Sequence, residues 1–320
     1  MPATNGSRLT DWLWADAYRL GSAIVRRTPD RLAVDLPRLL GPMFAAAMPG
    51  RRRMIERHQQ RAHGWTLTPA ERREAAVRAF ESYARYWVES FRLPDVDAAE
   101  LARHFEVTGW EHVQRGLDAG RGVILALPHL GGWEWAGFWA TRVQRVGMTV
   151  IVEPIDPPEL FEWFRDFRER LGMKVVPLGP QVAGEVSRAL ARNDIVCLLC
   201  DRDLVGTGVE TEFFGETTTL PGGPVTLGLR GGVPVLPTAV YFRGKRDHLG
   251  CIGPPLALER RGRLRDDVAA GTAVLAGELE TLIRRAPEQW HLFQPNWPSD
   301  HASLASTQQR RMFPPIAARS

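Results

Sequence analysis

The sequence predicts an α/β fold, in which a central, mostly parallel sheet is flanked by helices and a layer of helices lies at the N-terminus. Two observations lead to this prediction. Between residues 123 and 200, short apolar and β-branched runs alternate with helical patterns, as is typical of parallel strands joined by helices. Before residue 95, in contrast, the apolar residues recur at helical spacing. With 320 residues and 44% hydrophobic content, the chain can bury a large core.

The N-terminal region reads as amphipathic and basic helices. A first helix is expected to begin at Asp11, and a second apolar stretch runs from Leu32 to Met48. Arg53, Arg57 and Arg61 follow at intervals of four residues. Such helices suit the headgroup layer of an anionic membrane, where each cation near the surface contributes about 1 kcal/mol. The alternative is a solvated helical layer that covers the core. We therefore expect a membrane-facing helical segment over residues 1–95, a core over 96–300 and a loose tail over 301–320.

The remaining elements follow in order along the chain. Thr68 and Pro69 provide a helix cap and first turn, and that helix should end near Leu93. The predicted strands are residues 123–127, 149–152, 174–177, 195–200, 233–241 and 249–252. The predicted helices of this part are residues 111–119, 133–146, 158–171, 182–192 and 266–285, with a shorter apolar helix that ends at Arg230.

Charged side chains follow three of the predicted strands. His129 comes after the first of them, Glu153 after the second, and Asp201, Arg202 and Asp203 after the fourth. In parallel sheets, functional groups gather at the carboxyl ends of the strands. We therefore expect these residues to contribute to one site.

His129 lies in a strand-to-helix turn, and Glu134 follows it at the spacing H-x-x-x-x-E. This spacing lets the carboxylate turn back and hold one imidazole nitrogen, which leaves the other free as a general base. Gly131 and Gly132 would leave the neighbouring backbone bare for a substrate. The alternative for His129 and Glu134 is a structural pair.

Composition and motifs exclude several classes. The net charge is +4 and the pI about 9.3, and the excess of arginine admits anionic lipid, acyl-CoA and nucleic acid as partners. No nucleic-acid-binding module accompanies this charge, so nucleic acid is not expected. The sequence lacks a G-x-S-x-G elbow, a phosphate-binding P-loop and an H-E-x-x-H metal motif, so we expect neither metal nor cofactor.

The cysteines and the hydropathy pattern bear on the compartment. Cys197 and Cys200 lie on one predicted strand, where residues three apart point to opposite faces, so we expect them to pack in the core. The odd cysteine, Cys251, argues against a disulfide scaffold and for a reducing compartment. The first ten residues lack a signal-peptide core, and no apolar run reaches the roughly 18 residues of a spanning helix. Any membrane contact should be peripheral.

Taken together, the motifs resemble the lipid A biosynthesis lauroyl/myristoyl acyltransferase family, which has the glycerolipid-acyltransferase fold. The motifs that carry this resemblance are Pro128-His129-x4-Glu134, Asp201-Arg202-Asp203-Leu204, Phe213-Phe214-Gly215, Leu220-Pro221-Gly222-Gly223-Pro224 and the segment around Trp290. Segments 82–94 and 203–216 are similar to members that act on phosphatidylinositol mannosides. The resemblance implies transfer of a palmitoyl-like chain from acyl-CoA, as co-substrate, to a mannose hydroxyl of that glycolipid. It also implies a location at the cytoplasmic face of the plasma membrane.

The resemblance also implies residue roles. His129 would be the base and Glu134 its orienting acid, without a covalent intermediate, while Asp201 and Arg168 match further active-site positions. The family often has Asp where this chain has Glu134, and Glu where it has Asp201. We expect Arg168, Asp201, Arg202, Asp203 and Glu153 to bind substrate. Arg202 could instead pair with Asp201 and Asp203, and Glu153 could be a solvated charge or a cap.

Three other functions remain open at this point. The first is an acyltransferase for another glycolipid or a lysophospholipid, and the second is a thioesterase with water as the acceptor. The third is a non-catalytic lipid-binding protein of membranes, in which the His129 motif has no chemical role.

Overall fold

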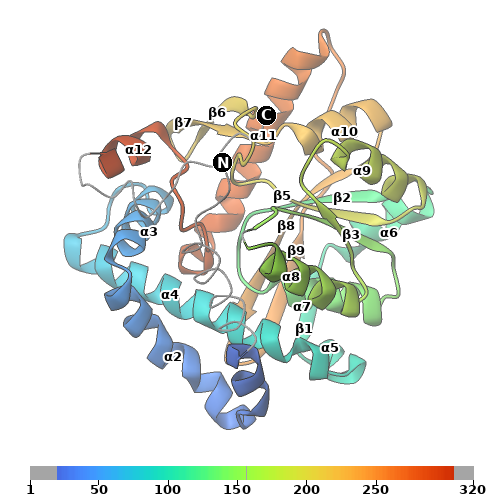
Figure 1. The fold of residues 1–320 in the computed structure, drawn as a ribbon. Coiled ribbons are helices and arrows are strands. Elements are labelled where there is room, and N and C mark those ends of the chain that lie inside the picture. The colour runs from blue at the N-terminus through green and yellow to red at the C-terminus, as the bar shows by residue number, and fades with distance from the viewer. Residues whose placement is uncertain (1–19, 156, 306–320) are drawn as a thin grey trace, which may run out of the picture.

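The computed structural model describes residues 20–155 and 157–305, and its fold is the predicted α/β arrangement (Figure 1). A seven-stranded sheet has the order β1-β9-β8-β2-β5-β3-β4, and β6 and β7 form a separate hairpin. The strands are β1 Phe105–Thr108, β2 Val123–Leu127, β3 Met148–Val152, β4 Lys174–Pro177, β5 Ile195–Leu199, β6 Val209–Phe213, β7 Glu216–Leu220, β8 Val235–Arg243 and β9 Asp247–Ile252.

Helices surround the sheet and form the N-terminal layer. Residues 20–27 are helical, and α2 to α4 follow them. The helices are α2 Asp30–Ala47, α3 Pro49–Ala62, α4 Pro69–Arg92, α5 Ala98–Arg103, α6 Trp110–Asp118, α7 Trp133–Arg142, α8 Pro158–Arg170, α9 Val182–Ala191, α10 Gly223–Gly231, α11 Leu264–Arg284 and α12 Pro298–Ala305. Two short 3₁₀ helices are η1 Leu93–Asp95 and η2 Pro287–Gln289.

The sheet topology brings the predicted strand ends together. β2 pairs in parallel with β5 and β8, and β5 also pairs in parallel with β3. The carboxyl ends of β2, β3 and β5 therefore share one edge, while β9 runs antiparallel to β8. Successive side chains on a strand face opposite layers. Leu125 accordingly packs in the core on the side of α7, and Ile124 in the core on the side of α9 and α11.

Three features differ from the sequence prediction or extend it. Strand β1 and the β6–β7 hairpin were not predicted, because these strands have only four or five residues each and contain many charged or hydroxyl side chains. Helix α12 occupies residues 298–305, including the start of the segment we expected to be loose. The expected helix start at Asp11 and the tail from residue 306 lie outside the described residues.

The N-terminal layer has the expected local signals. Thr68 caps α4, since its side chain accepts a hydrogen bond from the Glu71 backbone N–H. The Glu71 side chain in turn accepts a hydrogen bond from the Thr68 backbone N–H. Helix α2 packs along α4 and leaves apolar side chains exposed, among them Leu39 and Met43. Within the described part of the chain, no helix combines the length and the apolar character needed to cross a bilayer.

Candidate active site

The turn after β2 fixes the backbone of His129. Leu130 forms an antiparallel bridge with Trp290, and the Gly131 N–H donates to the Gln289 carbonyl at 3.0 Å. Gly131 has φ +61°, and a Cβ there would lie 1.9 Å from the Val240 carbonyl oxygen, so only glycine fits. The missing side chain at Gly131 therefore lets strand β8 pack directly against this turn. This corrects our expectation that Gly131 leaves room for a substrate. The bond to Gln289 also means that the Gly131 N–H already has an acceptor.

The His129 side chain is held by Asp201, which lies directly after β5. Nδ1 of His129 lies 2.6 Å from Asp201 Oδ1, and the His129 backbone N–H donates to Asp201 Oδ2 at 2.9 Å. Asp201 is fully buried, whereas the His129 side chain is 30% exposed. Because β2 and β5 are neighbours, their ends place these two residues side by side. The Nδ1–H therefore points at the carboxylate, and Nε2 is free of any hydrogen bond to the described residues.

Asp201 is ionised despite its burial. Burial alone would raise the pKa of its carboxyl group. The charge of His129 and the hydrogen bonds from His129 and Trp290 outweigh that effect, so the pKa lies below its usual value. An ionised Asp201 favours the tautomer with the proton on Nδ1 and stabilises an imidazolium when one forms.

Glu134 has a different partner from the one we predicted. Its Oε1 accepts hydrogen bonds from Arg168 Nε at 3.0 Å, Arg168 Nη2 at 2.8 Å and Tyr86 Oη at 3.1 Å. Glu134 lies in the first turn of α7, and its carboxylate bonds to residues of α4 and α8 rather than to the turn after β2. The expected pairing of Glu134 with His129 is therefore replaced by an ion pair with Arg168, and Asp201 takes the position next to the imidazole.

The Glu134–Arg168 pair lies in an aromatic and apolar environment. The guanidinium carbon of Arg168 is 4.9 Å from the centre of the Trp133 ring. Burial alone would lower the pKa of Arg168, but Glu134 outweighs it and the net pKa is raised. Burial and the Glu134 charge both raise the pKa of Tyr86, which remains a hydrogen-bond donor. Arg168 lines the adjacent cavity, so it is a fixed cation at the cavity wall.

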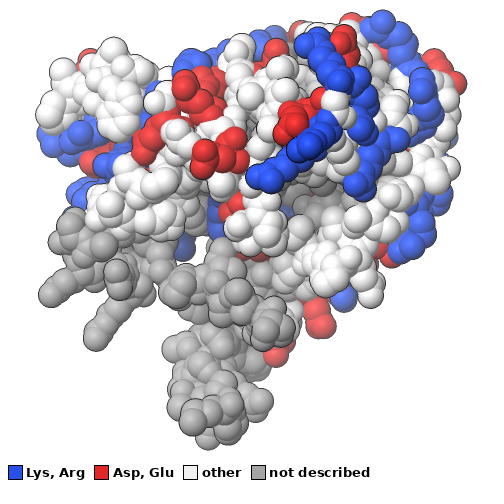
Figure 2. Space-filling model, turned by 90° about the horizontal axis from the view of Figure 1, so that it is seen from above, with Lys and Arg blue, Asp and Glu red and all other residues white. Residues whose placement is uncertain are grey.

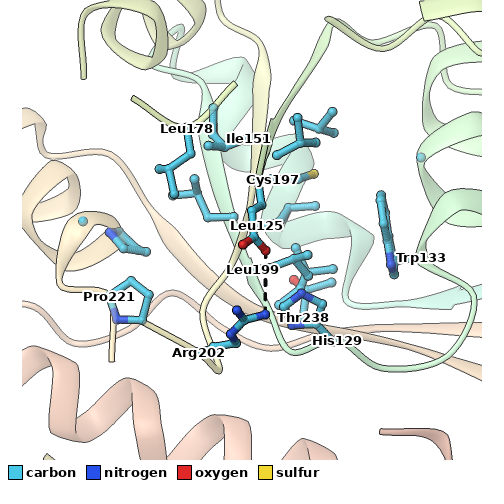
Figure 3. Close-up of a pocket in the computed structure, with 18 of the residues that line it drawn as sticks. Leu125, His129, Trp133, Ile151, Leu178, Cys197, Leu199, Arg202, Pro221 and Thr238 are labelled. Atoms are coloured by element: carbon cyan, nitrogen blue, oxygen red, sulfur yellow. Dashed lines mark ion pairs between the residues drawn. The ribbon is translucent and has the colours of Figure 1, made fainter. Parts of the chain in front are cut away.

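The other three predicted site residues have separate roles in the structure. Arg202 forms an ion pair with Glu153 at 3.7 Å, and both line the cavity (Figure 3). Asp203 instead organises its own loop, since its carboxylate accepts the backbone N–H groups of Val205, Gly206 and Gly208. The structure thus pairs Arg202 with Glu153, and the Asp203 carboxylate instead holds the backbone of the loop after β5.

A cavity of about 1260 Å³ opens beside His129. One lobe lies between α7 and the sheet, where alternate strand residues such as Val150, Leu125 and Cys197 line it (Figure 3). Along β3 this lobe runs from Val152 to Met148, a rise of roughly 13 Å for four residues of strand. A second lobe lies between α9 and α10, with Arg230 among its lining residues. Most of the residues that line the cavity are apolar, and Arg168, Arg202 and Glu153 are among the charged ones.

In the described part of the chain, no Ser or Cys side chain is hydrogen-bonded to the His129 ring, so nothing there indicates a covalent step. Burial, with a smaller contribution from the Glu134 charge, raises the pKa of the Cys197 thiol to about 12, so this cavity residue stays protonated. Cys200 follows β5 and is buried in the core on the side of α9 and α11. Among residues 20–155 and 157–305, we find no group of three or more His, Cys, Asp or Glu side chains that could hold a metal ion. The arrangement supports a general base that acts directly on a substrate hydroxyl.

Sequence reasoning missed four residues of this site. Tyr86 bonds Glu134, Trp290 Nε1 donates to Asp201 Oδ2 at 2.7 Å, and Asn296 Nδ2 donates to the Asp201 carbonyl at 3.0 Å. His291 lines the cavity, and its burial with the nearby His129 charge lowers its pKa to about 3, which keeps it neutral. All four lie far from the His129 motif in sequence. The available signals were the Trp290 segment and segment 82–94, which the resemblance included without a role for these residues.

Comparisons with known proteins identify relatives over nearly the whole chain. The model of the bacterial lipid A biosynthesis acyltransferase family matches residues 5–299. The chain is 38% identical over 311 residues to the phosphatidylinositol mannoside acyltransferase of Mycobacterium tuberculosis (strain ATCC 25618 / H37Rv), with 94% of this chain and 92% of the relative covered. It is 37% identical over 300 residues to the phosphatidylinositol mannoside acyltransferase of Mycolicibacterium smegmatis (strain ATCC 700084 / mc(2)155), with 92% and 93% covered.

Proposed function

The chain belongs to the bacterial lipid A biosynthesis acyltransferase family, and we propose that it transfers a palmitoyl-like chain from acyl-CoA to a mannose hydroxyl of a phosphatidylinositol mannoside. The observation that carries this proposal is the His129–Asp201 pair, whose free imidazole nitrogen borders a large apolar cavity. A base without an adjacent nucleophile fits direct acyl transfer, and an apolar cavity fits a fatty acyl chain.

The proposed reaction needs one proton relay. Neutral His129 takes the proton of the acceptor hydroxyl on Nε2 as the oxygen attacks the thioester carbonyl carbon. Asp201 stabilises the imidazolium through Nδ1. When the carbon–sulfur bond breaks, the imidazolium returns its proton to the departing thiolate, so the products are an ester and free CoA. Arg168, a buried cation at the cavity wall, is our candidate for stabilising the oxyanion.

The two lobes suggest how the substrates lie. The lobe under α7 has an apolar lining and would hold the acyl chain, whereas the α9–α10 lobe includes the exposed Arg230 and would hold the donor's carrier portion. Figure 2 views the molecule from the side of α9, α10 and the start of α11, and basic side chains predominate over half of that face. Clustered arginines favour a ligand with phosphate groups, as CoA has.

The cavity wall offers polar groups for the sugar. The Arg202–Glu153 pair supplies donors and acceptors that could bond hydroxyls of the acceptor near His129. Asp203 would act indirectly, because its carboxylate fixes the loop that carries Arg202.

Gly137 offers a test of the acyl lobe. It lies on α7, and a Cβ there would be 2.9 Å from Met173 Sδ and 3.5 Å from Met148 Sδ, at the end of the lobe away from His129. Gly137→Val should push the flexible Met173 side chain into the lobe and shorten it. We expect kcat/KM for palmitoyl-CoA to fall about tenfold relative to lauroyl-CoA. Equal losses with both donors would show that the acyl chain does not reach this end.

Membrane docking is the second part of the proposal. Exposed apolar side chains lie on the residue 20–27 helix and on α2, namely Leu20, Ile24, Leu32, Leu39, Met43 and Phe44. Exposed arginines such as Arg27 and Arg31 accompany them. An apolar surface beside cations is what peripheral binding to an anionic bilayer requires. We place the enzyme at the cytoplasmic face of the plasma membrane, where acyl-CoA is available.

Charge placed on this surface should weaken docking. Burial of a Leu or Met side chain contributes about 1.5–3 kcal/mol, so Leu39→Glu with Met43→Glu should reduce binding to anionic phospholipid vesicles by more than about tenfold. Vesicle cosedimentation measures this. Val274→Glu is the matched control, because Val274 is an apolar residue that is 48% exposed but belongs to α11 rather than to the residue 20–27 helix or α2. Equal binding by the double variant and the control would contradict the assigned face.

The deciding experiment measures thiol release from palmitoyl-CoA by the purified protein, with and without phosphatidylinositol mannoside in detergent. Release that depends on the acceptor, together with an acylated glycolipid in mass spectrometry, is the expected result. Release without acceptor would indicate a thioesterase. Release only with a lysophospholipid or another glycolipid would show that the acceptor is a different lipid. No release under any condition would favour a lipid-binding role.

A further inference from the structure

Residues 290–297, which join η2 to α12, contact the catalytic pair without touching the proposed reacting atoms. The His291 N–H donates to the His129 carbonyl at 2.7 Å, Trp290 Nε1 donates to Asp201 Oδ2 at 2.7 Å, and Asn296 donates to the Asp201 carbonyl. We propose that this segment, the C-terminal strap, is a positioning element and that Trp290 is the residue that orients Asp201 toward His129. This inference rests on the proposed function of His129 as the base.

The strap holds the indole of Trp290 in one orientation. Trp290 is 1% exposed, and its ring centre is 5.4 Å from that of Phe214 and 5.5 Å from that of His58. Phe214 lies in the turn of the β6–β7 hairpin, where it has φ +54°. A large ring packed between two others cannot rotate without opening the core. The direction of its N–H is therefore fixed by packing.

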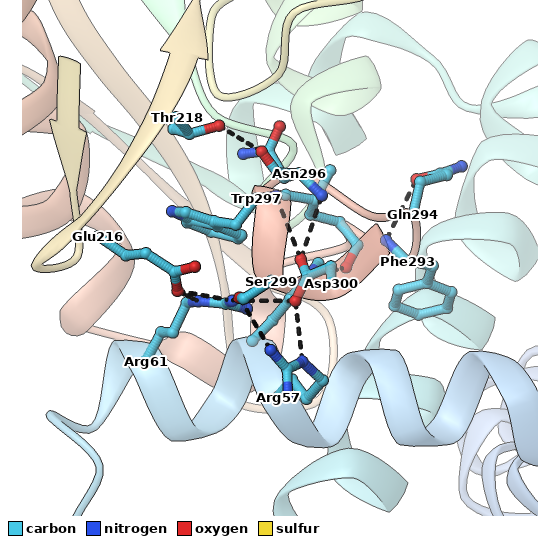
Figure 4. A network of polar contacts seen from close by, with 12 residues as sticks. Arg57, Arg61, Glu216, Thr218, Phe293, Gln294, Asn296, Trp297, Ser299 and Asp300 are labelled. Atoms are coloured by element: carbon cyan, nitrogen blue, oxygen red, sulfur yellow. Dashed lines mark hydrogen bonds and ion pairs between the residues drawn. The ribbon is translucent and has the colours of Figure 1, made fainter. Parts of the chain in front are cut away.

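A buried network anchors the other end of the strap to the N-terminal layer (Figure 4). Asp300 is fully buried, and its Oδ2 accepts the backbone N–H groups of Asn296 and Trp297. Its Oδ1 lies 2.9 Å from both Arg57 Nε and Arg61 Nη2, which come from α3. Burial alone would raise the pKa of Asp300, but His58 and the two arginines outweigh it and hold that pKa below its usual value.

The bond from Trp290 and the bond from the His129 backbone together fix which oxygen of Asp201 faces the imidazole. Oδ2 accepts both the His129 backbone N–H and the Trp290 indole N–H, which leaves Oδ1 for Nδ1 of His129. A hydrogen bond to a charged group stabilises a protein more than a hydrogen bond between neutral groups. The Trp290 bond also draws the negative charge of the carboxylate onto Oδ2, away from the oxygen that faces His129. Without the indole N–H, the carboxylate can turn more freely, and more of its negative charge lies on Oδ1 beside the imidazole.

Trp290→Phe removes this donor and keeps an aromatic ring. We expect kcat to fall about 10- to 100-fold with little change in KM, the size associated with a hydrogen bond to a charged group. The less dispersed charge on Asp201 should also favour the imidazolium, so the acidic limb of the kcat/KM profile should move to higher pH. Trp297→Phe is the matched control, because Trp297 is equally buried in the same strap but donates to the Phe213 carbonyl.

A second measurement does not depend on turnover. The Nδ1 proton that His129 shares with Asp201 should give a low-field proton resonance at low pH, assigned by its loss in His129→Ala. We expect this resonance to shift or broaden in Trp290→Phe and to persist in Trp297→Phe. If the wild-type protein transfers no acyl group, the proposed function fails, while the resonance still tests the positioning role.

The proposal is overturned if Trp290→Phe leaves the acidic limb unchanged or lowers it, or if Trp297→Phe moves the limb and the resonance as much. Should Trp290→Phe fail to fold, Asn296→Ala tests the strap at its bond to the Asp201 carbonyl. Reduced kcat at unchanged KM and melting temperature would then support positioning, and unaltered kcat would count against it.

Discussion

Replacement of His129 by alanine is expected to lower acyl transfer by about 10²–10⁴-fold, because a positioned base contributes that much to proton transfer. The residual rate would come from the cavity, which still holds the acyl chain beside the acceptor. The measurement is acceptor-dependent thiol release from palmitoyl-CoA at saturating substrate. The fold should survive, since the His129 side chain is 30% exposed and the turn is held by its backbone.

Two variants make this result interpretable. Asp201→Asn keeps the shape of the side chain but removes the charge that favours the Nδ1–H tautomer, so it should reduce kcat by a comparable factor. His112→Ala makes the same substitution as His129→Ala on α6, outside the residues that line the cavity, and should leave kcat unchanged. Turnover retained by His129→Ala at the wild-type level would remove His129 as the base.

The sequence was most informative where strands are buried and parallel. β2 and β4 have the predicted bounds, and β3 and β5 differ by one residue, because continuous apolar runs between turn residues mark such strands. β1 escaped prediction because its four residues gain their order from pairing with β9. Pairing between strands about 140 residues apart leaves little trace in local composition.

For the site, the sequence indicated the position of His129 but not the partner of its side chain. Glu134 is five residues away along the chain, yet its helix turns it toward Arg168 and Tyr86. Asp201 is the spatial neighbour because β5 lies beside β2, and strand order cannot be read from the spacing of motifs. The contact between Trp290 and Asp201 joins residues that are still further apart in the sequence than His129 and Asp201. Short-range spacing therefore predicts where a reactive group lies better than it predicts its partner.

Because Glu134 forms a buried ion pair with Arg168, its replacement is expected to lower the stability of the protein strongly. Glu134 is 2% exposed, and the Arg168 side chain is 13% exposed. Glu134→Ala would leave a buried guanidinium and the Tyr86 hydroxyl without their shared acceptor. Breaking one partner of a buried ion pair costs about 3–5 kcal/mol, so the free energy of unfolding should fall by that amount in denaturant titrations. Lys174→Ala removes a partner of Glu185 in a pair whose Lys174 side chain is 48% exposed, and should cost less than about 1 kcal/mol.

A double variant separates the charge from the packing. Arg168→Met removes the unpaired cation, so Glu134→Ala with Arg168→Met should recover part of the stability that Glu134→Ala loses. The same residues also decide between the two possible partners of His129. If Glu134 only holds Arg168, Glu134→Gln should retain more activity per folded molecule than Asp201→Asn, because the amide oxygen can still accept from Arg168 and Tyr86. A larger loss of kcat in Glu134→Gln than in Asp201→Asn would restore Glu134 as the orienting acid and contradict the arrangement described above.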